Sequence, residues 1–142
     1  MLHPNPEVIK KIENRTWAPP QDQIGKTIAL HAAKSWDKTA FSYFHRIGIT
    51  DYPGRFDLYP SGVVLGVATI DRVRTGDREN LPKDLEPNQR RWFFGPFGWF
   101  MIDAVSLPDP IPLKGGQGLR ELPPEQNQLV LDACARIGRV IT

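Results

Sequence analysis

The sequence predicts an α+β fold that is mainly β, built as a small β-barrel with flanking helices. Residues 62–73 carry apolar side chains on both alternating faces, and one of those faces holds the small residues Gly66 and Ala68. That pattern is typical of a strand in a closed or half-closed barrel, where another backbone approaches closely. Fourteen prolines and twelve glycines divide the chain into short pieces. The length of 142 residues predicts one domain spanning residues 1–142.

The first half of the chain is expected to contain two helices and a strand. Residues 5–7 (NPE) combine a capping side chain, a proline suited to the first helical position and a carboxylate near the positive end of the helix dipole. We expect this short helix to run to about residue 13. Residues 26–33 alternate as a strand, and a serine-capped helix should follow over residues 35–47, with a glycine as its stop. Residues 51–60 are expected to form a loop.

The second half is expected to begin with a strand over residues 62–73, an exposed charged loop over 74–91 and a second strand over 97–105. An extended connection over 107–112, a glycine-rich turn over 114–119 and a helix over 123–137 should follow. In the last helix the spacing places Val130, Ala133, Cys134 and Ile137 inward, and Gly138 ends it.

Composition limits the classes of function. The single cysteine, Cys134, excludes an intrachain disulfide and a cysteine-based zinc site. His3 and His45 lack partners at ligand spacing, so we expect neither a metal nor a cofactor. No apolar run approaches the ~18 residues of a membrane span, and the start of the chain lacks a signal-peptide layout, so we expect a cytoplasmic protein. Residues 1–46 carry seven Lys/Arg against four Asp/Glu, which is compatible with an anionic partner.

The segment IKKIENRTW (residues 9–17) is the first candidate site. Lys10 and Glu13 would share a helix face, and alternation beyond the helix places Glu13, Arg15 and Trp17 on a common side. The cations keep the carboxylate ionised and positioned, and the indole offers a flat surface for stacking a base. A surface ion pair beside a half-buried tryptophan explains the same spacing, and this alternative stays open.

A second candidate region is RRWFFGPFGWF (residues 90–100). Paired arginines beside aromatic rings suit nucleic acid, because cations meet phosphate and rings stack on bases. We expect at least one ring before the turn to be exposed, with Trp92 as the candidate for stacking and Arg91 extending the phosphate track. An aromatic core behind a basic loop is the alternative. His31 is either a structural strand residue or part of the site, and Lys34 would hold phosphate.

Four segments occur in an order that points to a known family. Lys10, Glu13 and Arg15 match the signature Gly-x-Lys-x-x-Glu-x-Arg, with Val8 standing where the glycine would be. Residues 31–34 (HAAK), 62–68 (GVVLGVA) and 92–98 (WFFGPFG) follow in sequence. This order resembles the ASCH domain family, which is related to the PUA domain of RNA-modifying proteins. The resemblance covers roughly residues 7–119.

The resemblance implies a PUA-like β-barrel with a cleft near the signature that binds RNA or a nucleobase, so the expected partner is RNA or a nucleoside. The expected ligand-binding residues are Lys10, Glu13, Arg15, Trp17, His31, Lys34, Arg91 and Trp92. A small hydrolase acting on acylated nucleosides or RNA is an alternative, with Glu13 as general base and Lys10 or Lys34 stabilising negative charge. The acetylcytidine hydrolases use a threonine where this chain has Glu13, so their mechanism does not transfer. A protein-interaction domain that uses residues 74–91 is the third interpretation.

Overall fold

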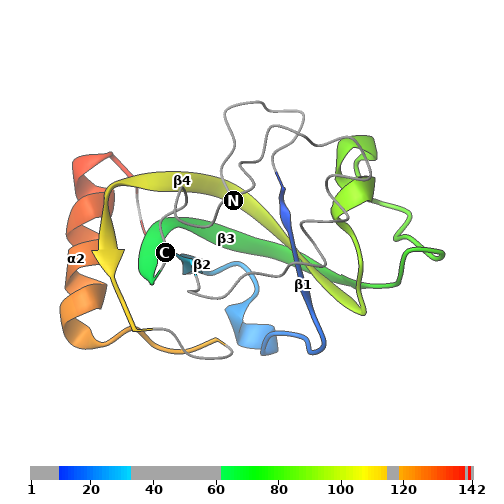
Figure 1. Ribbon diagram of the computed structural model, residues 1–142, viewed down its shortest axis with the longest axis horizontal. Coiled ribbons are helices and arrows are strands. Elements are labelled where there is room, and N and C mark those ends of the chain that lie inside the picture. The colour runs from blue at the N-terminus through cyan, green and yellow to red at the C-terminus, as the bar shows by residue number, and fades with distance from the viewer. Residues whose placement is uncertain (1–9, 33–61, 115–118, 140, 142) are drawn as a thin grey trace.

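The computed structural model describes residues 10–32, 62–114, 119–139 and 141 (Figure 1). Within these residues, four antiparallel strands form one sheet in the order β1-β4-β3-β2. Two short 3-10 helices and one α-helix accompany the sheet in the same part of the chain. In chain order the elements are β1 (Ile12–Arg15), η2 (Gln21–Gln23), β2 (Thr27–Ala32), β3 (Val63–Thr75), η4 (Pro87–Trp92), β4 (Phe97–Pro112) and α2 (Pro124–Arg136).

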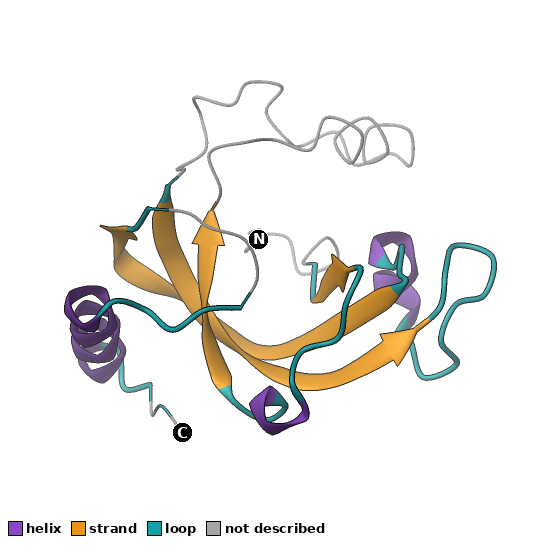
Figure 2. Cartoon of the chain, turned by 90° about the horizontal axis from the view of Figure 1, so that it is seen from below, coloured by secondary structure: helices purple, strands orange, loops and turns teal. Residues whose placement is uncertain are grey.

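The sheet curls into half a barrel because its two central strands are long and irregularly paired (Figure 2). β3 and β4 span 13 and 16 residues, and their register shifts at three places. Such bulges bend a strand and increase its twist. Within the described residues no pairing joins β1 to β2, so these strands do not close a barrel. The mainly β fold is confirmed, and the closed form of the expected barrel is not seen.

The strand predicted over residues 62–73 is confirmed as β3, and so is the close approach at Gly66. A Cβ atom on Gly66 would lie 2.3 Å from the carbonyl oxygen of Val105 on β4. Ala68, two residues further, is 1% exposed. The strand predicted over residues 26–33 is likewise confirmed as β2. Small residues therefore stand where the curled sheet brings two backbones together.

The described residues form a hydrophobic core with two parts, one at each end of the sheet. The first lies between α2 and the strands and includes Val64, Val67, Leu107, Ile111, Val130, Ala133 and Cys134. The second lies under the segment that connects β3 to β4 and consists of Ile12, Leu85, Trp92, Phe93 and Phe100. No helix among the described residues is long and apolar enough to cross a membrane.

The last helix follows its predicted stripe except at its end. Val130, Ala133 and Cys134 are buried as expected, and burial raises the pKa of the Cys134 thiol although the charge of Arg139 opposes the shift. Ile137 is 40% exposed, so its predicted burial is wrong. Helical geometry ends at Arg136, and the chain turns at Gly138, whose φ is +74°. Ile137 therefore no longer follows the buried stripe.

The helix expected to run to about residue 13 is wrong for its last residues, because Ile12–Arg15 is strand β1. β1 pairs with β4, placing Ile12 opposite Phe100 and Glu13 opposite Trp99. Ile12 is 2% exposed in the second core. Tertiary pairing has overridden the local helix signals. The earlier part of that helix, the helix over residues 35–47, the loop over 51–60 and most of the glycine-rich turn lie outside the described residues.

The segment LPDPIP, expected to be an extended connection, instead forms the end of strand β4. Proline is tolerated at a strand edge that needs no donor. In the described structure β1 pairs only with residues 97–100 of β4, so the rest of β4 has β3 as its one strand neighbour. The charged loop is also shorter than expected. Residues 74–75 belong to β3, and Pro87–Trp92 form η4 with Gln89 buried.

A charged tether fixes the segment between β3 and β4. Asp84 Oδ2 accepts hydrogen bonds from Arg72 Nε and Arg74 Nε, both at 3.0 Å, and the Arg72 guanidinium lies 4.1 Å above the Phe100 ring. Desolvation acts to raise the pKa of Asp84, but the hydrogen bonds and charges of the two arginines outweigh it. The pKa of Asp84 is therefore lowered below 3.8.

We expect this tether to weaken in acid. Because the pKa of Asp84 is lower in the folded protein, its contribution to stability is present above the ordinary aspartate pKa and is lost as pH falls through the lower folded value. The difference in melting temperature between the wild type and Asp84→Asn should therefore shrink as the pH is lowered from about 7 to about 2.5. Asp22→Asn, an exposed carboxylate on η2, is the control. A difference that stays constant over this range would contradict the assignment.

Candidate functional site

The acidic and basic residues of the signature segment lie on one face of β1. Alternation along a strand puts Glu13 and Arg15 on the same side of the sheet, and their side chains form an ion pair of 3.0 Å. The Glu13 side chain is 39% exposed and that of Arg15 is 47% exposed. Glu13 lies opposite Trp99 on β4, and Arg15 lies opposite Phe97. We call this side of the sheet the Trp99 face.

Trp17 completes the group on the Trp99 face. Its ring meets that of Trp99 edge-on, with centroids 4.9 Å apart and planes at 84°. Trp99 Nε1–H also donates a hydrogen bond of 3.1 Å to the carbonyl oxygen of Trp17. Trp99 is 3% exposed whereas Trp17 is 36% exposed. The buried indole therefore fixes the position of the exposed one, which follows the Glu13–Arg15 pair in the chain.

Asn14 has a positioning role that was not predicted from its sequence pattern. It points to the opposite side of β1, where its Nδ2 donates to the carbonyl oxygen of Trp92 at 2.8 Å. Its Oδ1 accepts from the backbone N–H groups of Phe94 and Gly95 at 2.8 and 3.1 Å. One amide thus anchors the turn before β4 to the strand that carries Glu13 and Arg15. An asparagine on the inward side of a strand, in phase with the buried Ile12, is the only sequence signal for it.

The second candidate region does not present its tryptophan to solvent. Trp92 and Phe93 are both 0% exposed, so the expected exposure of Trp92 is wrong. Both rings pack in the second core with Ile12 and Phe100, because η4 turns them onto the sheet. Phe94 and Arg91 are half-buried. An aromatic core behind a basic loop therefore describes this stretch better than an exposed stacking surface does.

Among the described residues, no hydrogen bond or ion pair joins His31 or Lys10 to the Trp99 face. His31 lies on β2, at the sheet edge opposite β1, and its Nε2–H donates to the carbonyl oxygen of Leu113 at 2.9 Å. That hydrogen bond gives it a structural role. Lys10 is half-buried just before β1, and Lys34 lies outside the described residues. Of the predicted site residues, the structure brings together Glu13, Arg15 and Trp17.

The group on the Trp99 face offers one acceptor, one planar donor and one flat apolar surface. A carboxylate accepts hydrogen bonds only, a guanidinium donates only, and an indole can stack. Within the described ranges, no three His, Cys, Asp or Glu side chains lie close enough together to hold a metal ion. The exposed Glu13–Arg15 pair also fits the simpler interpretation of a surface ion pair beside a partly buried tryptophan.

No known family model matches the chain, and no curated protein is significantly similar to it.

Proposed function

We propose that the chain is a binding module for a single-stranded or modified nucleobase, as its resemblance to ASCH domains implies. The observation that carries the proposal is the exposed indole of Trp17, held by Trp99 next to an exposed carboxylate and guanidinium. Stacking on an aromatic ring and hydrogen bonding to a base edge are the two contacts by which proteins hold unpaired bases.

Each of the three side chains has a role in the proposed complex. A base stacks on the Trp17 ring, and Glu13 accepts a hydrogen bond from an exocyclic amino group. Cytosine and adenine carry such a group and uracil does not. Arg15 contacts phosphate or an acceptor on the base edge. The exposed fractions of these side chains, 36–47%, leave them accessible to a ligand.

The test is fluorescence anisotropy with short labelled RNAs of cytosine, adenine or uracil. We expect a dissociation constant on the order of micromolar for cytosine or adenine RNA, weaker binding to uracil RNA, and affinity that falls with salt. Trp17→Ala should weaken binding about 5–150-fold, because stacking of one base contributes about 1–3 kcal/mol. Glu13→Gln should reduce the preference over uracil more than it reduces total binding.

Leu131→Ala is the matched control, since Leu131 is also 36% exposed but lies on α2. It should leave RNA binding unchanged. Equal affinities for the wild type, Trp17→Ala and Glu13→Gln would refute the proposed site. Turnover of labelled RNA or of an acylated nucleoside, lost in Glu13→Gln, would instead favour the hydrolase alternative.

A further inference from the structure

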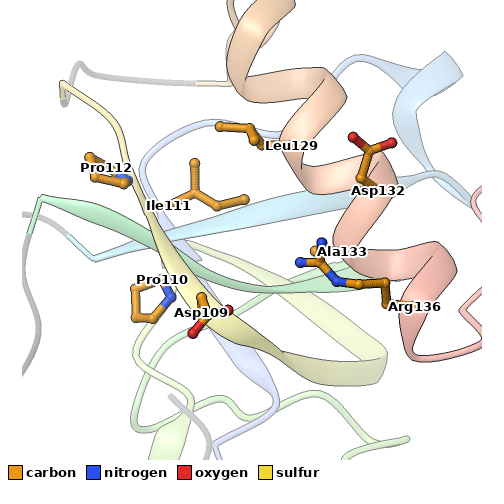
Figure 3. Close-up of a pocket in the computed structure, with 8 residues that line it drawn as sticks. All are labelled: Asp109, Pro110, Ile111, Pro112, Leu129, Asp132, Ala133 and Arg136. Atoms are coloured by element: carbon orange, nitrogen blue, oxygen red, sulfur yellow. The ribbon is translucent and has the colours of Figure 1, made fainter.

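A groove lies between the C-terminal end of β4 and α2, at the opposite end of the strand from Trp99 (Figure 3). Its volume is about 280 Å³, and its lining residues are Asp109, Pro110, Ile111, Pro112, Leu129, Asp132, Ala133 and Arg136. The strand contributes the first four and the helix the last four. Ile111 and Ala133 are 7% and 1% exposed and belong to the core beneath. Leu129 is 45% exposed and forms part of the helix wall.

Charged side chains of both signs border this apolar floor. Figure 3 shows Asp109 on the strand side, Asp132 on the helix side, and the Arg136 side chain extended past Ala133 toward β4. Asp132 accepts a hydrogen bond of 2.8 Å from Gln128 Nε2. Among the described residues, neither Arg136 nor Asp109 has an ion-pair partner within 4.0 Å. A carboxylate and a guanidinium thus stand on opposite walls without pairing with each other.

The strand wall adds hydrogen-bond acceptors but few donors. Pro110 and Pro112 line the groove, and proline has a backbone carbonyl but no N–H. The N–H of Leu113 is used as well, because it donates to the carbonyl oxygen of Gly62 at 3.0 Å. A ligand group that hydrogen-bonds to the backbone of Pro110 or Pro112 must therefore be a donor. An ammonium group fits, since it has three donors and no acceptor.

We propose that this groove binds an apolar α-amino acid as its zwitterion. The ammonium lies at Asp109 and the strand carbonyls, the carboxylate lies at Arg136, and the apolar side chain covers Ile111 and Leu129. A guanidinium holds a carboxylate through two parallel hydrogen bonds. The groove volume of about 280 Å³ lies close to the ~300 Å³ lower end of small-molecule pockets, which suits a ligand as small as an amino acid.

The experiment is titration of ¹⁵N-labelled protein with L-leucine, followed by backbone amide chemical shifts. We expect saturable shifts confined to residues 107–113 and 128–137, with a dissociation constant on the order of 1 mM. Leucine amide lacks the carboxylate, 4-methylpentanoate lacks the ammonium, and glycine lacks the apolar side chain. Each should bind about tenfold more weakly or not at all. This panel needs no variant, so it tests the proposal on the wild-type protein.

Two substitutions test the assigned roles. Arg136→Gln should weaken leucine binding about tenfold but leave the weak binding of leucine amide unchanged. Asp109→Asn should weaken leucine but not 4-methylpentanoate. Lys83→Gln and Asp22→Asn are the controls, because they remove one positive and one negative charge from exposed residues elsewhere in the fold. Neither should change leucine binding. The proposal is overturned if leucine gives no saturable shifts in the groove, if 4-methylpentanoate binds as tightly as leucine, or if neither groove variant weakens binding. RNA binding at the Trp99 face is independent of each of these results.

Discussion

Replacing Trp92 by alanine is expected to lower the free energy of unfolding by about 3–5 kcal/mol. Trp92 is 0% exposed, and it packs with Ile12, Leu85, Phe93 and Phe100 where the segment before β4 covers the sheet. Removing so large a buried side chain loses its transfer free energy and leaves a cavity that a close-packed core only partly refills.

Urea denaturation followed by circular dichroism measures this loss for Trp92→Ala. Trp17→Ala is the control, because the 36% exposed Trp17 ring contributes less buried area, and its loss should cost clearly less. The comparison also distinguishes a tryptophan of the core from an exposed tryptophan that stacks on a base. If Trp92→Ala were as stable as the wild type and lost RNA binding, Trp92 would be a surface stacking residue and the buried position would be wrong.

Asn14→Ala is expected to lower the free energy of unfolding by about 2–4 kcal/mol, since each buried polar group left without a partner costs about 1–3 kcal/mol. The substitution removes one hydrogen bond to the carbonyl group of Trp92 and one to each of the N–H groups of Phe94 and Gly95. Water reaching these half-buried groups offsets part of the cost, which places the expected value below the sum.

Hydrogen exchange distinguishes this local role from general destabilisation. The amides of Phe94 and Gly95 should lose protection in Asn14→Ala by more than the amides of β2 do, because β2 lies at the far edge of the sheet. Asn127→Ala, an exposed asparagine on α2, should change stability by no more than about 0.5 kcal/mol. Uniform loss of protection across all strands would show that Asn14 does not act specifically on the turn.

The two largest effects fall on positions that sequence reasoning judged differently. Trp92 follows two arginines and precedes a Phe-Phe-Gly-Pro turn, which locally resembles an exposed, nucleic-acid-binding stretch. Asn14 lies between Glu13 and Arg15, whose charges form the more conspicuous sequence motif. In both cases the deciding contact is distant in the chain: the Asn14–Trp92 hydrogen bond joins residues 78 positions apart.

The periodicity of apolar residues predicted the correct element where the pattern extended over many residues. The strands at residues 27–32 and 63–75 and the helix at 124–136 follow patterns repeated over several side chains. It failed at the four-residue strand Ile12–Arg15, which is too short to show a period and follows a local helix signal. It also failed at the prolines of β4, because their tolerance depends on which edge of the strand has a neighbour.

The sequence by itself determined that this protein is mainly β, that Gly66 lies where two backbones approach, and that Cys134 is a core residue. These properties follow from side-chain size and periodicity, which act on neighbouring residues. Only the tertiary structure decided that Trp92 is buried, that Trp99 holds the Trp17 ring, and that Asp109 and Arg136 lie on opposite walls of a groove. Each of these depends on pairing between segments far apart in the chain, and such pairing is selected by the free energy of the whole packed sheet rather than by any local pattern.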